Sequence, residues 1–189
     1  MARRRGGTYA EQRERRRAVD DPELVLAAGL RFLEARARSV AEVRRRLTQG
    51  GYQPALVDGA IERLVELGML DDAAFARSWI ESRDRARPRA ERALRQELAV
   101  KGVERVVVDR LLDERSAVDG AAERDVNAAL MLLERQRRTL EREPDPRRRR
   151  QKAYGLLARH GFDGDACRDA IDRWNEDRLV DPSEGDGIP

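Results

Sequence analysis

Apolar residues recur at helical spacing in three similar segments of the chain. Each segment ends at a glycine, namely Gly51, Gly102 or Gly161, and an apolar residue follows each glycine directly. A leucine lies four positions before each glycine, and another apolar residue lies eight positions before it. A glycine in this place is typical of a left-handed C-cap, on which the next apolar residue packs back against the helix. The pattern therefore predicts three amphipathic helices that end at these glycines.

The same register continues on both sides of the three glycines. Apolar residues stand six and ten positions after each of them, as expected for a further helix. Upstream, Leu24, Phe75 and Val126 repeat every 51 residues, whereas Gly102 and Gly161 are 59 residues apart. The third segment therefore holds eight additional residues, near positions 137–150. We expect the core of the repeats to comprise Leu24, Val43, Leu47, Gly51, Val57, Ile61, Phe75, Trp79, Leu94, Leu98, Gly102, Val108, Leu112, Leu130, Leu157, Gly161 and Ile171.

Signals for helix boundaries agree with this periodicity. Ser39 and Glu42 have the spacing of a capping box. Pro54, Pro88 and Pro146 suit the first turn of a helix, where the missing N–H has no intrahelical partner to lose. No run of β-branched residues alternates with polar ones, so no strand is expected. The predicted helices cover residues 23–37, 40–49, 54–67, 72–87, 89–101, 105–115, 119–142, 147–160 and 165–176.

The pattern predicts an all-α fold, an elongated tandem array of three three-helix repeats. The repeats are expected at residues 22–70, 71–117 and 118–176, the last with the insertion. A unit of about 50 residues buries little apolar surface alone, so neighbouring repeats should pack end to end. Polar residues 1–21, which are rich in arginine, and residues 177–189, which are rich in acids, glycine and proline, are predicted to be disordered tails.

The composition supports thin amphipathic helices and indicates the cellular compartment in which the protein is expected. Hydrophobic and charged residues each make up 40% of the chain, and the formal net charge is only +3. This balance is unlike that of a protein that coats nucleic acid. With one cysteine the chain forms no internal disulfide, which fits a reducing compartment. Since no apolar stretch approaches the roughly 20 residues of a membrane span, we expect a cytoplasmic protein without membrane contact, and a monomer.

Residues that carry enzymatic chemistry are scarce. Neither Lys101 nor Lys152 belongs to a Gly-Lys-Ser/Thr sequence, which excludes a phosphate-binding loop of that kind. His160 directly precedes a capping glycine, where a histidine interacts well with the helix dipole. Cys167 occupies a core position of the repeat. One histidine and one cysteine do not make a zinc site by themselves. We therefore expect no enzymatic activity, no catalytic residue, no cofactor and no metal.

Three arginine clusters stand out, in or next to the second helix of each repeat. One interpretation is a discontinuous basic strip that contacts an acidic protein groove or phosphates. The other is a solvated face in a chain in which all basic residues but two lysines are arginine. The candidate contact residues are Arg44, Arg45, Arg46, Arg83, Arg89, Arg92, Arg95, Arg147, Arg148, Arg149, Arg150 and Lys152.

The second repeat resembles the RecX family of regulatory proteins most closely. The matching segments are 72–83 (DAAFARSWIESR) and 95–103 (RQELAVKGV). The first repeat adds 30–33 (LRFL), Ser39 to Glu42, Leu47 and Gly51-Tyr52, and the third matches through Tyr154, Leu157, Gly161-Phe162 and Trp174. The resemblance covers about residues 24–174, which is most of the chain.

This resemblance implies tandem three-helix repeats and a function that spacing cannot show. RecX-like proteins bind the RecA recombinase and lodge along the groove of its filament on single-stranded DNA. They lower ATP hydrolysis, strand exchange and filament extension, and so modulate DNA recombination, DNA repair and the SOS response. No catalytic residue comes with the family, and some members also make a weak direct contact with DNA.

Two further hypotheses remain open from sequence alone. Three-helix units with basic second helices superficially resemble helix-turn-helix domains, which bind DNA directly. Against this hypothesis, net charge is low and no short set of base-reading residues is apparent. The other hypothesis is an interaction scaffold unrelated to recombination.

Overall fold

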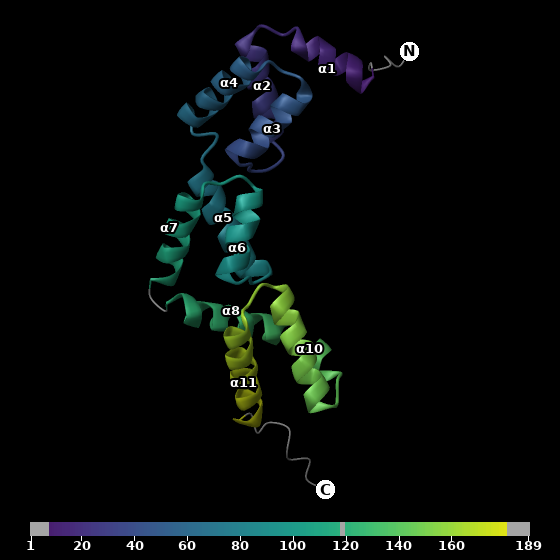
Figure 1. Ribbon diagram of the computed structural model, residues 1–189, viewed down its shortest axis with the longest axis vertical. Helices are drawn as coiled ribbons and strands as arrows, with labels where there is room; N and C mark the ends of the chain where they lie inside the picture. Colours follow the sequence, from purple (N-terminus) through teal and green to yellow (C-terminus); the bar gives the residue numbers. More distant parts are fainter. Residues whose placement is uncertain (1–7, 118–119, 181–189) are drawn as a thin grey trace. The chain divides into compact units, whose positions relative to one another are not determined.

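The computed structural model of the protein describes residues 8–117 and 120–180. Within these ranges the chain is all-helical, with eleven helices and no strand, which confirms the predicted all-α class (Figure 1). The helices are α1 (Tyr9–Arg17), α2 (Pro22–Leu33), α3 (Val40–Gly50), α4 (Pro54–Glu66), α5 (Asp72–Ala86), α6 (Glu91–Val100), α7 (Arg105–Ser116), α8 (Ala121–Arg135), α9 (Arg137–Glu141), α10 (Pro146–Arg159) and α11 (Gly164–Val180).

The helix ends follow the signals in the sequence. Ser39 caps α3 in a capping box, in which the Ser39 hydroxyl accepts the N–H of Glu42 and the Glu42 carboxylate accepts the N–H of Ser39. Gly51, Gly102 and Gly161 follow the second helices with φ angles of 101°, 79° and 91°. Because a side chain makes this left-handed region unfavourable, glycine is the residue that ends these helices most easily.

The chain divides into two compact units. The first holds the residues up to Ala76 together with Ala99–Val107, and the second holds Arg77–Leu98 together with the residues from Val108 onward. Figure 1 shows α2, α3 and α4 gathered in one bundle, and α8, α10 and α11 in another. Each bundle surrounds its own apolar core, with Val43 and Leu47 in the first and Leu133 and Leu157 in the other.

Most residues predicted for the core are buried. Leu130 is half-buried and packs against the core of the last bundle, and the three glycines are helix caps rather than core residues. The predicted residues that are buried are Val43, Leu47, Val57, Ile61, Phe75, Leu94, Leu98, Val108, Leu112, Leu157 and Ile171.

Leu24 and Trp79 differ from the prediction. Leu24 is 51% exposed, whereas the next residue, Val25, is fully buried. The α2 helix begins at Pro22 behind the Asp21 cap, and this phase turns Val25 and Gly29 toward the core. Trp79 is half-buried, and its indole N–H donates to the Glu97 carboxylate at 2.8 Å. The face that carries Trp79 is therefore polar as well as apolar.

Several element boundaries also differ from the prediction. The polar segment expected to be a disordered basic tail contains α1, because Thr8 and Glu11 form a capping box. The predicted helix over 119–142 breaks at Gln136 into α8 and α9, and α6 begins at Glu91, three positions after Pro88. The α11 helix runs to Val180, into the segment expected to be the acidic tail. Residues 1–7 and 181–189 of the two predicted tails lie outside the described residues.

Successive repeats meet in a recurring arrangement inside each unit. The glycine that ends one second helix lies against the start of the second helix of the preceding repeat. In the first unit a side chain on Gly102 would collide with the Cβ of Ala41, and in the second unit a Cβ on Gly161 would lie 2.6 Å from that of Ala93. The hydroxyl of Ser39 also donates to the carbonyl of Lys101 at 2.6 Å. Glycine is thus required for close packing as well as for its φ angle.

Candidate partner-binding surfaces

Three of the candidate arginines tie the second helix of a repeat to its third helix. Arg44 pairs with Asp58, Arg95 Nε donates to Asp109 Oδ1 at 2.9 Å, and Arg150 pairs with Asp172. The hydrogen bond that Arg95 donates to Asp109 raises the pKa of Arg95 above its ordinary value. These side chains act inside their own repeats, so a contact with a partner would have to compete with an existing ion pair.

Two candidate arginines of the second repeat converge on one carboxylate. Arg83 Nε lies 2.7 Å and Arg89 Nε lies 3.4 Å from the carboxylate oxygens of Glu97. Arg83 also stacks 4.5 Å from the centre of the Trp79 ring, whose N–H donates to Glu97 as well. Glu97 offsets one of the two arginine charges, and sequence alone did not reveal this because Glu97 is 14 residues from Arg83.

The basic run of the third repeat is also largely paired. Lys152 forms an ion pair with Glu143, and this hydrogen bond lowers the pKa of Glu143. Arg149 donates to the backbone carbonyl of Glu143 at 3.1 Å, and Arg148 lies 3.7 Å from the Asp145 carboxylate. Of this run, Arg147 and Arg149 have no acidic side-chain partner among the described residues.

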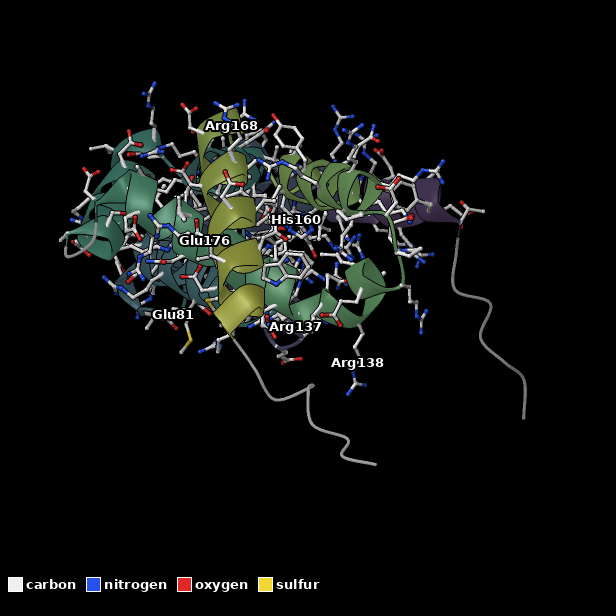
Figure 2. The ribbon with its side chains drawn as sticks, turned by 90° about the horizontal axis from the view of Figure 1, so that it is seen from below. Glu81, Arg137, Arg138, His160, Arg168 and Glu176 are labelled. Carbon is white, nitrogen blue, oxygen red and sulfur yellow. The ribbon has the colours of Figure 1, made fainter. Side chains whose placement is uncertain are left out.

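Four exposed candidate side chains carry no ion pair in the part of the chain that the structure describes. They are exposed and therefore available to an acidic or phosphate-bearing partner. Figure 2 shows charged side chains all around the helices, and it labels a further exposed arginine, Arg138 of α9, which extends away from the ribbon. The four candidates are Arg45 and Arg46 of α3, Arg92 of α6 and Arg147 of α10.

A pocket beside α3 combines arginines with aromatic rings, and we call it the basic-aromatic pocket. Its volume is about 250 Å³, and its lining includes Arg16, Arg31, Arg46, Phe32 and Tyr52 but no acidic residue. The Arg46 guanidinium lies 5.6 Å from the Phe32 ring centre, and that of Arg16 lies 5.8 Å from the Tyr52 ring centre. Guanidinium groups without acidic neighbours, next to flat rings, suit a phosphate or carboxylate that carries a planar group.

The basic-aromatic pocket was missed in the sequence apart from Arg46. Its arginines come from three helices, and Tyr52 follows a capping glycine, where the sequence predicts packing against the helix. Arg38 covers the Phe32 ring from another direction, 4.3 Å from its centre, and the Nε of Arg38 is buried without a hydrogen-bond partner. One signal for the pocket was present in the sequence. Arg31 and Phe32 are adjacent between Leu30 and Leu33, so an arginine and an aromatic ring occur side by side there.

A buried polar cluster connects α6 to α8 in the second unit. Glu91 is 6% exposed, and its carboxylate accepts a hydrogen bond from Ser116 and pairs with Arg95 at 3.3 Å. Asp125 accepts the backbone N–H of Glu91 at 3.1 Å. Burial raises the pKa of Asp125 to about 6, and the negative charges of Glu91 and Asp163 add to this. This cluster holds helices together and is remote from the basic-aromatic pocket in sequence.

Replacing Asp125 by asparagine should make stability less dependent on pH. The folded chain keeps a proton on Asp125 up to about pH 6, whereas the unfolded chain loses it near the ordinary pKa of 3.8. The contribution of Asp125 to stability therefore falls as pH rises through this window. We expect the advantage of Asp125→Asn over the native chain, measured by urea unfolding, to grow between about pH 4 and pH 7. An equal difference at every pH would contradict this assignment.

The groups considered for catalysis have structural neighbours. The Nδ1 of His160 lies 3.0 Å from the carbonyl oxygen of Pro88. Cys167 is buried, and burial raises the pKa of its thiol. Among the residues that the structure describes, no cluster of histidine, cysteine, aspartate and glutamate is arranged to hold a metal ion. None of the described helices is long and apolar enough to cross a membrane.

These features define a class, that of helical proteins built from tandem three-helix repeats with an arginine-rich surface. Comparison with known proteins then identifies the family. Models of the first, second and third three-helix domains of RecX match residues 26–64, 71–112 and 123–171. The chain therefore belongs to the RecX family.

Individual relatives agree with this assignment. The regulatory protein RecX of Mycobacterium sp. (strain JLS) is 39% identical over 144 residues, which cover 75% of this chain and 76% of the relative. The regulatory protein RecX of Chlorobium phaeobacteroides is 28% identical over 156 residues, 82% of this chain and 97% of the relative. The crystal structure of RecX from Lactobacillus salivarius has a TM-score of 0.68 at 18% identity, and the match covers 83% of this chain and 98% of that one. This structural likeness supports the fold.

Proposed function

We propose that this chain binds the RecA recombinase, or RecA assembled on single-stranded DNA, and inhibits its ATP hydrolysis, strand exchange and filament extension. In this role it modulates DNA recombination, DNA repair and the SOS response in the cytoplasm, without an enzymatic step of its own. The observation that carries the proposal is the match to all three RecX domains in chain order, residues 26–64, 71–112 and 123–171.

The mechanism that we propose is physical obstruction. Several weak contacts on one chain gain strength through effective concentration, so that a chain that touches more than one recombinase subunit resists their movement. We favour Arg45, Arg46, Arg92 and Arg147 as the contacts, because they have no ion pair to break among the described residues. Arg44, Arg95 and Arg150 are less suitable, since each is held by an aspartate of its own repeat.

A second candidate function is direct binding of single-stranded DNA. The basic-aromatic pocket favours it, because arginines track phosphates and rings offer surfaces on which bases stack. In this chain the pocket is small, with a volume of about 250 Å³. We therefore expect it to add to a recombinase contact rather than to hold DNA alone.

Sedimentation with a labelled single-stranded oligonucleotide distinguishes the two functions. We expect the protein to pellet with RecA filaments formed on the oligonucleotide, and to bind the bare oligonucleotide far more weakly. Tight binding to bare DNA that falls steeply with salt would favour the direct DNA-binding function instead. Absence from the filament pellet at every salt concentration would contradict recombinase binding.

A further inference from the structure

The glycine that ends α3 meets a helix in the same way as the glycines of the other two repeats. A Cβ on Gly51 would lie 2.6 Å from Cγ and 2.7 Å from the backbone oxygen of Arg13, which belongs to α1. The corresponding neighbours are Ala41 of α3 at Gly102 and Ala93 of α6 at Gly161. In all three repeats, therefore, a helix from earlier in the chain presses on the capping glycine.

Hydrogen bonds repeat the same arrangement. The carbonyl directly before each capping glycine accepts a bond from the helix that packs there or from the residues that lead into it. Ser39 donates to Lys101 at 2.6 Å, and the N–H of Ala90 donates to His160 at 3.4 Å. In the first repeat Arg16 Nη1 of α1 donates to the carbonyl of Gly50 at 3.5 Å. The α1 helix thus contacts Gly51 and the carbonyl of Gly50. These are the two groups that correspond to the ones a preceding repeat contacts in the second and third repeats.

The α1 helix differs from α3 and α6 in what it buries. No residue of α1 is buried, whereas α3 and α6 each place several residues in a core. Its own capping box stabilises its start, and Tyr9 donates to the carbonyl of Gln49 at 3.0 Å. Gln53 donates to the carbonyl of Arg17, the last residue of the helix, and to that of Val19 just after it. Polar bonds and close contact at Gly51, rather than an apolar core, therefore hold α1 in place.

We propose that the face of the first repeat formed by Gly50, Gly51, Tyr52 and Gln53 is a helix-docking surface, and that α1 is its occupant. On this surface α1 takes the place that the second helix of a preceding repeat takes on the second and third repeats. It closes the first end of the array, as terminal caps do in other repeat proteins. The docked α1 also brings Arg16 over Tyr52, so the basic-aromatic pocket is complete only when α1 is bound.

Hydrogen exchange of the amides of residues 9–17 in the full chain tests this assignment. We compare Gly51→Ala with Gly68→Ala, because both glycines have positive φ angles of 101° and 68°, but a Cβ on Gly68 meets nothing within 4 Å. Both variants place an alanine at a positive φ angle, and only Gly51→Ala pushes on α1. We expect exchange in α1 to become about tenfold faster or more in Gly51→Ala and to stay near the native rate in Gly68→Ala.

A milder variant examines the surface without touching the first repeat. Tyr9→Phe removes the hydroxyl that donates to Gln49 and leaves Gly51 unchanged, so exchange in α1 should rise by a few-fold. The proposal is overturned if the native α1 exchanges as fast as an unfolded peptide. It is also overturned if Gly51→Ala and Gly68→Ala change the exchange of α1 equally.

Discussion

Gly102→Ala is expected to lower the free energy of unfolding by about 2–5 kcal/mol, as measured by urea denaturation. Two effects add at this position. The φ angle of 79° makes a side chain unfavourable by about 1–2 kcal/mol. The new Cβ would also collide with the Cβ of Ala41 across the joint between repeats, and overpacking of this kind costs about 1–3 kcal/mol.

The two effects at Gly102 are separable by controls within the chain. Gly68→Ala carries the φ effect alone, since nothing lies within 4 Å of the added Cβ. Ala41→Gly removes the atom that collides, so the double variant should recover part of the loss. If Gly102→Ala costs no more than Gly68→Ala, or if Ala41→Gly fails to restore stability to the double variant, the close joint does not exist in solution.

The double variant Arg45→Glu and Arg46→Glu is expected to raise the concentration for half-inhibition of RecA at least about tenfold. Neither side chain has an ion pair among the described residues, so reversal leaves no acid of the first repeat without its partner. Each reversal removes an attraction and adds a repulsion at an acidic partner, and about 1.4 kcal/mol corresponds to a factor of ten. The assay is ATP hydrolysis by RecA on single-stranded DNA.

A charge-matched variant provides the control for this experiment. Arg63 and Arg110 are 56% and 62% exposed, and among the described residues each pairs with a glutamate of its own helix. Such surface pairs contribute little to stability, so Arg63→Glu with Arg110→Glu changes the net charge equally without unfolding the chain. Equal loss of inhibition in both double variants would show that general charge, rather than the surface at α3, determines binding.

The repeat architecture could be predicted because backbone requirements recur in the sequence. Gly51, Gly102 and Gly161 each need a left-handed φ angle and room for a packed helix, and few residues besides glycine satisfy both. The apolar positions four and eight before these glycines follow helical geometry, and they are buried in all three repeats. The prediction for Leu24 was wrong because Leu24 begins a run of apolar residues, so only the helix phase set at Asp21 and Pro22 distinguishes it from Val25.

The roles of the arginines could not be predicted from the sequence. Arg44 and Arg45 are neighbours of the same type, yet Arg44 pairs with Asp58 of α4 and Arg45 has no ion pair among the described residues. Arg44 and Asp58 are 14 residues apart in the chain, so which of the two arginines faces an acid depends on how α3 packs against α4. The α1 helix was missed for a related reason, because it is polar throughout and is held by tertiary contacts rather than by an apolar stripe.

The central claim is that this chain restrains a recombinase by binding to it, and RecA-catalysed ATP hydrolysis on single-stranded DNA tests it most directly. Titration with the native chain should lower the rate of ATP hydrolysis at a ratio below one chain per RecA subunit. The reason is that one chain that bridges several subunits restrains all of them. An unchanged rate up to an equimolar amount of this protein, at a salt concentration where RecA filaments form, would contradict the account.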